Sequence, residues 1–268
     1  MIARVTRRFA PAVAVALLAI ASTACDIVTA DLRSEESSNW QKSYPLEAGG
    51  RLEIGNVNGK IRVEASSGKT VEVTATKKAR GATPEQARAA LERATFAETV
   101  SAGSVKIETK IARTSGFTLN GNSLQVEYTV KVPEGVEVHL TTVNGGIEVN
   151  GMKGRVFAET TNGGVETRGI TGAIEAATVN GGLDIEMAAI PEGGVKLECT
   201  NGGIKLRLPR DAKATISASV ANGGISAGDL PIDATGENSR RRLEGKLNGG
   251  GPRVQIEGTN GGITLTSR

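Results

Sequence analysis

The chain has 268 residues, of which 38% are hydrophobic and only 3% aromatic, and its formal net charge is +3. The excess comes from the first 24 residues, which hold three arginines and no acid: without them the 32 basic residues become 29 and equal the 29 acidic ones. Since nucleic-acid binding needs a basic face, this balance argues against a nucleic-acid partner.

The chain begins with a stretch typical of an export signal. Three arginines precede an almost wholly apolar run over residues 9–21, and small residues lead from there to Cys25. The run is too short to span a membrane reliably, so residues 1–24 are predicted to be a signal peptide. A cysteine directly after small residues resembles a bacterial lipoprotein signal, which predicts a lipid on Cys25 that anchors the chain to a membrane. Ordinary signal-peptidase cleavage stays open as the alternative, because Ser22 stands where lipoprotein signals usually carry Leu, Val or Ile.

The next segment, residues 25–38, is polar and lacks periodicity, so it is predicted to be a flexible tether. The folded domain is expected over residues 39–268. Its first alternating apolar residues predict an opening unit of the repeat that follows, and they are Leu52, Ile54, Ile61 and Val63.

An insertion over residues 65–133 interrupts the repeat. Alternating runs predict strands over residues 71–75, 105–109 and 124–130. A helix is expected over about residues 84–97, with Thr83 as its N-cap, Pro84 in its first turn and Gln86 placed to complete a capping box. Because solenoids need capped ends, the insertion is expected to be a small α+β cap over the open end of the repeat.

From residue 136 onward a unit built on Asn-Gly-Gly recurs. Its asparagines stand at 144, 162, 180 and 201, at intervals of 18, 18 and 21 residues. With the Asn counted as zero, positions −6, −4, −2, +3 and +5 are mostly apolar and the positions between them mostly polar. Each unit is therefore predicted to form two short strands with one buried face. The unit asparagines, earlier and later ones included, are Asn58, Asn144, Asn162, Asn180, Asn201, Asn222 and Asn260.

Two arrangements of these strands are compatible with the alternation. Asn-Gly between strands is the strongest short signal for an antiparallel hairpin. Like residues recur in the same column of every unit, however, which favours parallel stacking with each Asn bonded to the Asn of the next unit. The expected fold class is all-β: a parallel β-solenoid or β-helix-like repeat of about seven rungs with Asn-Gly-Gly corners. The amides are expected to point inward, and both glycines to supply positive φ angles.

These segments resemble a known family. The opening segment (residues 50–59), the successive Thr-x-Asn-Gly units and the closing segment (residues 247–252) are similar to the bacterial putative-adhesin family, a domain of unknown function built from β-strand repeats. The resemblance covers about residues 40–268. It implies an envelope location and a repetitive β fold, and some relatives are linked to envelope stress responses. It supplies no catalytic residues.

The cysteines and the one histidine predict no catalytic or metal chemistry. Cys199 has an inward −2 position, expected to stack between Thr178 and Val220, where a thiol behaves as a small apolar group. Two such cysteines predict no disulfide framework. His139 has an outward −5 position, and a lone histidine is a poor candidate for a metal site or a catalytic triad.

Charged residues form one column and one run. Glu148, Glu166 and Asp184 all have position +4 and are expected to stack on adjacent rungs. The ordinary interpretation is ion pairing on a solvated face; the sharper hypothesis is a weak Ca²⁺ site, since hard cations take carboxylate oxygens. A basic run is either a solvated loop or a contact for anionic headgroups or acidic glycans, and it comprises Arg240, Arg241 and Arg242.

Together these features favour a non-enzymatic binding or scaffold protein of the bacterial cell envelope, facing the periplasm or the surface. Its expected partners are the membrane, through the lipid, and an unknown envelope protein or glycan; no cofactor is predicted. One alternative is an accessory or sensor protein of envelope stress. The other is a polysaccharide-active β-helix enzyme with paired carboxylates, which is disfavoured because the acids follow the repeat instead of converging on one cleft.

Overall fold

The computed structural model describes residues 34–112, 124–236 and 238–268. The predicted signal peptide and Cys25 lie outside these residues. Within the described ranges, none of the helices has the length and apolar character needed to cross a membrane. The described residues belong to one compact unit, and nearly all of its regular structure is β.

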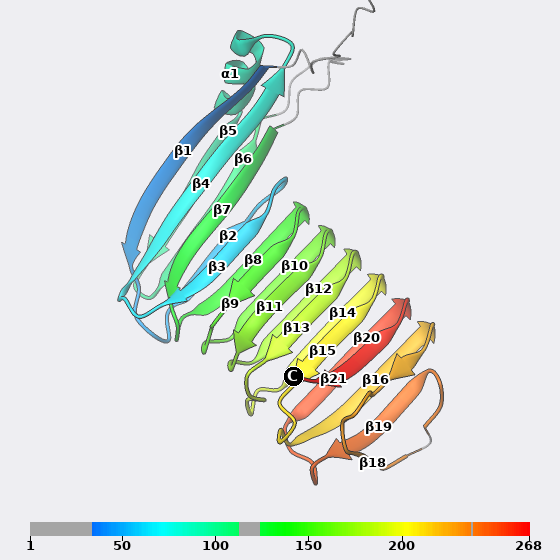
Figure 1. Ribbon diagram of the computed structural model, residues 1–268. Coiled ribbons are helices and arrows are strands. Elements are labelled where there is room, and N and C mark those ends of the chain that lie inside the picture. The colour runs from blue at the N-terminus through cyan, green and yellow to red at the C-terminus, as the bar shows by residue number, and fades with distance from the viewer. Residues whose placement is uncertain (1–33, 113–123, 237) are drawn as a thin grey trace, which may run out of the picture. The chain divides into compact units, whose positions relative to one another are not determined.

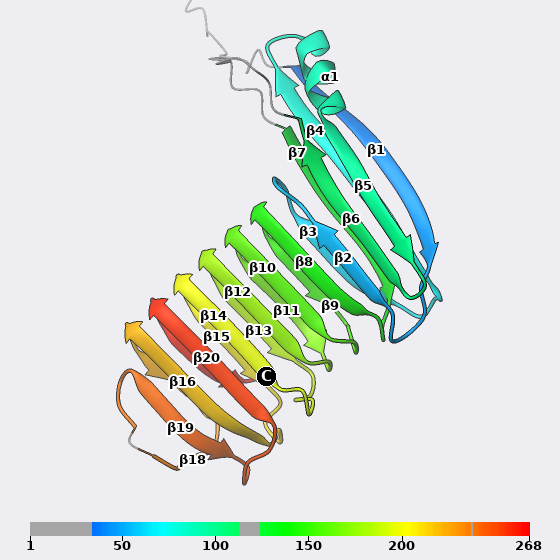
Figure 2. The same cartoon turned by 180° about the vertical axis from the view of Figure 1, so that it is seen from behind.

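The strands form two sheets, which we call sheet A and sheet B (Figures 1 and 2). In spatial order, the ten strands of sheet A are β1 (Ser34–Pro45), β4 (Thr70–Gly81), β7 (Leu124–Pro133), β3 (Ile61–Ser66), β9 (Ile147–Asn150), β11 (Val165–Ile170), β13 (Leu183–Met187), β15 (Ile204–Leu208), β21 (Ile263–Ser267) and β17 (Ile225–Ser226). The eleven strands of sheet B are β18 (Ile232–Ala234), β19 (Arg242–Leu247), β16 (Ala214–Asn222), β20 (Arg253–Asn260), β14 (Val195–Asn201), β12 (Ile174–Asn180), β10 (Val156–Asn162), β8 (Glu137–Asn144), β2 (Arg51–Gly55), β6 (Ser104–Ile111) and β5 (Ala94–Ser101).

Each repeat unit contributes one strand to each sheet, and equivalent strands pair in parallel and in register. In sheet B, Asn144 pairs with Asn162 and Asn162 with Asn180; in sheet A, Ile147 pairs with Val165. Like residues therefore lie beside like residues along the stack. The parallel arrangement is confirmed, and the hairpin alternative is wrong for these strands.

The inward columns form a continuous core between the sheets. Leu140 and Val149 are completely buried, and the equivalent positions of other units are buried as well. At position −2 the buried hydroxyl of Thr160 donates to the carbonyl of Gly145 on the neighbouring rung, over 2.8 Å, and Thr178 bonds Gly163 in the same way. A buried threonine is thus tolerated in each unit because the adjacent corner supplies its acceptor.

The last two rungs do not stack in chain order. The red strand β20 lies between β14 and β16 in Figure 1, and β21 likewise pairs with both β15 and β17. Cys199 is consequently paired with Gly258, and the prediction that it stacks against Val220 is wrong. The segment between β17 and β20 forms β18 and β19, which occupy the edge of sheet B. These two antiparallel strands cover an edge that β16 would otherwise leave open.

The asparagines form a single hydrogen-bonded ladder, as the parallel stack predicts, but the ladder lies on the surface. The order along the stack is Asn58, Asn144, Asn162, Asn180, Asn201, Asn260 and Asn222, and in each step the Nδ2 of one amide donates to the Oδ1 of the preceding one, over 2.7–3.0 Å. From Asn144 on, the side chains are exposed. The prediction that the Asn side chains point inward is wrong, because the alternation of buried and exposed residues ends at position −2. The chain turns there, and the side chains at positions −1 and 0 both face water.

The N-terminal cap extends both sheets. β6 and β7 continue the parallel pairing next to β2 and β3. Antiparallel strands then follow: β4 and β1 in sheet A, and β5 in sheet B. The first strand begins at Ser34, so the predicted tether (residues 25–38) is wrong for residues 34–38, which pair with β4.

The helix α1 (Pro84–Glu92) packs against β4 and β1 and begins as predicted. Thr83 Oγ1 accepts from the N–H of Gln86 over 3.3 Å, and the Gln86 side chain accepts from the N–H of Ala82. The helix is shorter than the predicted range of 84–97, because the chain enters β5 at Ala94. Pairing of β5 with β6 overrides the continued helical pattern there.

Two aromatic rings pack against the core at this end, and Ala90 and Leu91 of α1 belong to the same buried core. Trp40 on β1 and Phe96 on β5 have ring centroids 4.7 Å apart, and both pack against the core. Tyr128 lies beneath them, with its hydroxyl 2.7 Å from the Thr109 hydroxyl. The terminal strands therefore cover this end of the core with their own side chains.

The ladder leads to a test. Asn180 bonds two neighbours, whereas Asn222 bonds only Asn260. A hydrogen bond contributes about 0.5–1.5 kcal/mol net, so Asn180→Ala should lower the free energy of unfolding by about 1–2 kcal/mol and Asn222→Ala by about half of that. Urea denaturation measures both, and equal losses would show that the ladder adds no specific stability.

Candidate binding groove

A groove of about 430 Å³ crosses the strands of sheet A next to the Asn-Gly-Gly corners. It runs along the stack, from the rung of β3 to the rung of β21. Its floor is the second glycine of each corner, and its wall is formed by the side chains at position +4. The floor residues are Lys60, Gly146, Gly164, Gly182, Gly203 and Gly262, and the wall residues are Glu148, Glu166, Asp184, Lys205 and Thr264.

The two glycines of each Asn-Gly-Gly corner have different structural roles. A Cβ added to the first glycine of the units from Gly145 to Gly261 would lie 1.7–2.1 Å from a carbonyl oxygen of the neighbouring rung. The first glycine is therefore required by close backbone contact. Its φ is positive at most corners, from 121° at Gly59 to 157° at Gly163, whereas the floor glycines have no positive φ. The prediction of positive φ angles is therefore confirmed for the first glycine at these corners and wrong for the second.

The second glycine has no such steric requirement at most rungs; the exception among the floor glycines is Gly164, where an added Cβ would lie 2.9 Å from the Gly182 carbonyl oxygen. An added Cβ at Gly182 would meet nothing closer than 3.4 Å, and at Gly203 nothing closer than 3.6 Å. No floor glycine has a positive φ. Lys60 occupies this same position in the opening unit, which shows that the backbone accepts a side chain there. The floor is thus kept free of side chains although the fold does not demand it at most rungs.

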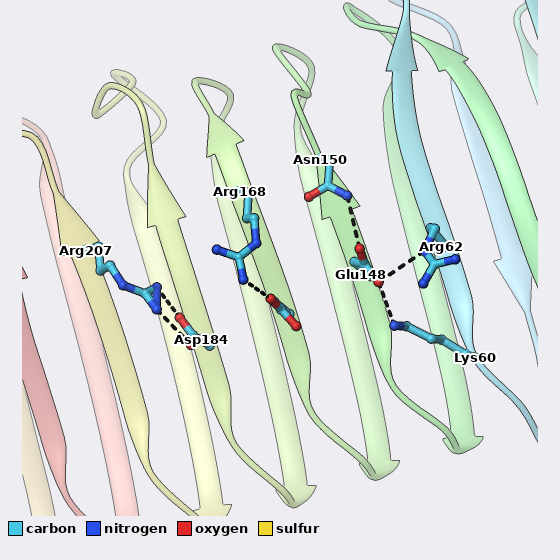
Figure 3. Close-up of polar contacts among 8 residues, drawn as sticks. Lys60, Arg62, Glu148, Asn150, Arg168, Asp184 and Arg207 are labelled. Atoms are coloured by element: carbon cyan, nitrogen blue, oxygen red, sulfur yellow. Dashed lines mark hydrogen bonds and ion pairs between the residues drawn. The ribbon is translucent and has the colours of Figure 1, made fainter. Parts of the chain in front are cut away.

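The wall combines acidic and basic groups from adjacent rungs (Figure 3). Register places Glu148 beside Glu166 and Glu166 beside Asp184, as predicted. Each carboxylate, however, contacts a cation: Glu166 pairs with Arg168, and Asp184 with both terminal nitrogens of Arg207.

Glu148 is the most strongly paired of the three. Its Oε2 lies 2.6 Å from Lys60 Nζ and 3.1 Å from Arg62 Nε, and its Oε1 accepts from Asn150 over 3.3 Å. The Lys60 hydrogen bond is the main cause that lowers the pKa of Glu148 from 4.5 to about 2, with smaller contributions from Asn150 and Arg62. This carboxylate is therefore ionised throughout the physiological range.

The geometry favours ion pairing over the calcium hypothesis for Glu148, Glu166 and Asp184. Their oxygens are directed to cationic side chains on the same or the next strand (Figure 3). Within the described ranges, no group of three or more His, Cys, Asp or Glu residues could hold a metal ion. A calcium ion would have to displace these cations before it could bind.

The other residues singled out by the sequence lie away from the groove. His139 stacks on Phe157 with ring centroids 5.3 Å apart, and its Nε2 lies 2.6 Å from Glu137. Cys199 is buried and free, its thiol donates to the Gly181 carbonyl, and burial raises its pKa.

The basic run of Arg240, Arg241 and Arg242 lies beside β16 and β17 of the last rung. The backbone carbonyl of Arg240 accepts from Ile225, and that of Arg241 accepts from Val220. Arg242 is ion-paired with Glu244. The backbone of the run thus pairs with residues of β16 and β17, while its side chains are exposed.

Sequence reasoning did not single out the floor of the groove or Lys205. The glycines were assigned to the corner as a pair, so the freedom of the second one was missed. A signal was present: the opening unit reads Asn58-Gly59-Lys60, which keeps the first glycine and replaces the second. Lys205, paired in register with Asp184, breaks the acidic column at its far end.

The two glycines can be separated by experiment. Gly181→Ala places a Cβ 2.0 Å from the Gly163 carbonyl oxygen, so we expect a loss of at least about 3 kcal/mol or failure to fold. Gly182→Ala should change the free energy of unfolding by less than about 1 kcal/mol. Thermal melts followed by circular dichroism measure both. Similar losses in the two variants would contradict the distinction.

Glu148 predicts a pH dependence. Because its pKa is lowered in the folded state, its stabilisation is present above the unfolded value near 4.5 and is lost as the pH falls toward 2. Glu148→Gln should therefore cost roughly 1 kcal/mol at pH 7, after allowance for solvent screening, and nothing near pH 2. Denaturation at pH 7, 4 and 2 measures the difference. The exposed Glu159 on β10 is the matched control; a parallel pH profile for Glu148→Gln and Glu159→Gln would contradict the assignment.

Comparisons with known proteins give one matching family model and several similar solved structures. A family model described as Toastrack DUF4097 matches residues 91–266. A solved structure titled as a putative cell adhesion protein from Clostridium sporogenes is 14% identical, with a TM-score of 0.48 over 86% of this chain and 100% of that chain. A putative adhesin from Bacteroides fragilis is 10% identical, with a TM-score of 0.39 over 86% of this chain and 97% of that chain. No curated protein matches the chain.

Proposed function

We propose that this chain, which belongs to the Toastrack DUF4097 family, is a non-enzymatic binding protein of the bacterial cell envelope that holds an extended polymer in the groove of sheet A. One observation carries the proposal: the groove repeats the same floor and a polar wall rung after rung. A site of constant cross-section along the stack suits a linear ligand with a repeating structure. A compact small molecule would use only one or two rungs.

The chemistry of the wall supports binding in preference to catalysis. A glycosidase needs a carboxylic acid whose pKa is raised and a second carboxylate at a suitable distance. Here the pKa of Glu148 is lowered to about 2, and Glu166 and Asp184 are each held by an arginine. Glu148 is therefore not suited to donate a proton near neutral pH.

The envelope location is part of the proposal and rests on the leader sequence and the family. Residues 1–24 are typical of an export signal, and Cys25 is the candidate for the lipid that tethers the domain to a membrane. The adhesion named in the titles of the similar structures belongs to those proteins. A role in sensing envelope stress stays a prediction, because no contact or site described above favours it.

Co-sedimentation with purified bacterial cell envelopes tests the groove. The variant Gly182→Lys repeats at the centre of the floor what Lys60 does at its end, and should block a polymer that lies across it. The matched control, Ala177→Lys, adds the same charge on β12 of sheet B, between Glu159 and Glu198. We expect saturable binding by the full chain and by Ala177→Lys, and at least a tenfold loss with Gly182→Lys. No saturable binding, or equal binding by all three, would overturn the proposal.

A further inference from the structure

The corners leave one backbone donor in each rung without a protein acceptor. The N–H of the first glycine donates to the Asn carbonyl of the next rung, as Gly163 does to Asn180 over 2.9 Å. The carbonyl of the second glycine accepts from the preceding rung, as Gly182 does from Val165 over 3.0 Å. The N–H groups of the floor residues, in contrast, meet no acceptor within the described part of the chain. These residues line the groove, so their unpaired donors form a column there.

The spacing of this column restricts what can bind it. Neighbouring strands lie about 4.8 Å apart, so acceptors on a ligand along the stack must recur at that distance or at twice that distance. An extended polypeptide advances about 3.3 Å per residue and presents same-side carbonyls about every 6.6 Å. It would fall out of register within two or three rungs. The sugars of an extended β-1,4-linked glycan advance by about one strand spacing each, and alternate sugars face opposite ways, so same-side groups recur at every second rung.

The wall supplies the complementary chemistry. Sugar hydroxyls donate hydrogen bonds, and ionised carboxylates are acceptors only. Glu166 bonds Arg168 through Oε1, which leaves its Oε2 for a ligand hydroxyl. Because each wall carboxylate is already paired with a cation of the protein, the groove presents no uncompensated run of like charge, which suits a neutral, hydroxyl-rich chain.

We infer that the groove binds an extended β-1,4-linked glycan that carries N-acetyl groups; the inference rests on the proposed function and names its ligand class. Acetamido carbonyls accept from the floor N–H groups of every second rung, and hydroxyl oxygens of the intervening sugars accept from the others. Hydroxyl hydrogens are donated to the carboxylates of the wall. The floor N–H groups and the Oε2 of Glu166 thereby gain partners that their neighbours in the fold do not provide.

Binding of this kind depends on length. No aromatic side chain is among the residues that line the groove, so sugars are held by hydrogen bonds without ring stacking. Each bond contributes little after desolvation, and a ligand must cover several rungs to bind measurably. A tetramer should bind roughly 30-fold more weakly than a hexamer, which corresponds to the loss of about two net hydrogen bonds.

Titration calorimetry of the full chain with two hexasaccharides tests the inference. The probe is the β-1,4-linked hexamer of N-acetylglucosamine, and the matched control is the β-1,4-linked hexamer of glucose, which has the same backbone and no acetamido groups. We expect the N-acetylated hexamer to bind at least tenfold more tightly than the glucose hexamer. Gly182→Lys should abolish this binding, and Ala177→Lys should retain it.

The outcomes separate the ligand class from the groove itself. Equal affinity for the two hexamers, or no binding of the N-acetylated hexamer, overturns the assignment of the glycan. If envelope binding still depends on Gly182 in that case, the proposed function stands with another polymer. Should Gly182→Lys fail to fold, Gly203→Lys replaces it, because a Cβ at Gly203 meets only the Gly262 carbonyl oxygen, at 3.6 Å. Unchanged affinity in a folded variant places the ligand elsewhere and overturns the inference.

Discussion

The structure depends on direct backbone contact between successive corners. The first glycine of each Asn-Gly-Gly unit lies so close to the carbonyl oxygen of the adjacent rung that a methyl group cannot be inserted. This contact holds equivalent residues side by side and fixes the register of both sheets. Like-with-like columns, the asparagine ladder and the threonine bonds across the core all follow from that register.

A repeat of this kind converts one residue position into a line on the surface. Position +2 becomes the floor of a groove, because its glycine carries no side chain; position +4 becomes a wall. The in-register repeat also aligns the asparagines into a row of exposed amides. A single substitution therefore alters one segment of a line, and Lys60 shows this at the start of the groove, where it reaches Glu148.

Ion pairs stabilise the wall of the groove. Stacked carboxylates would repel one another, yet each is paired with a cation from its own or an adjacent strand. The arrangement satisfies the charges pair by pair along the stack. It leaves some carboxylate oxygens and the floor N–H groups as the polar atoms with capacity to spare, which is why recognition by hydrogen bonding is the chemistry that this surface supports best.

The amino-acid sequence by itself determined the features that depend on neighbours along the chain. Alternation around Asn144 and Asn162 predicted the buried columns, the likeness of successive units predicted parallel pairing, and Thr83 with Gln86 marked the start of α1. These signals are local, because strand parity and helix capping are set within a few residues.

Only the tertiary structure decided what depends on distant pairing. The Asn side chains face water because the chain turns at the corner, and β5 replaces the end of a helix because β6 is beside it. The position of β20 between β14 and β16 likewise depends on pairing between strands that are far apart in the sequence. The different roles of Gly181 and Gly182 also became visible only with the neighbouring rung in place. The alternation of apolar and polar residues cannot predict such contacts, because it shows which face of a strand a residue lies on and not which strand is its neighbour.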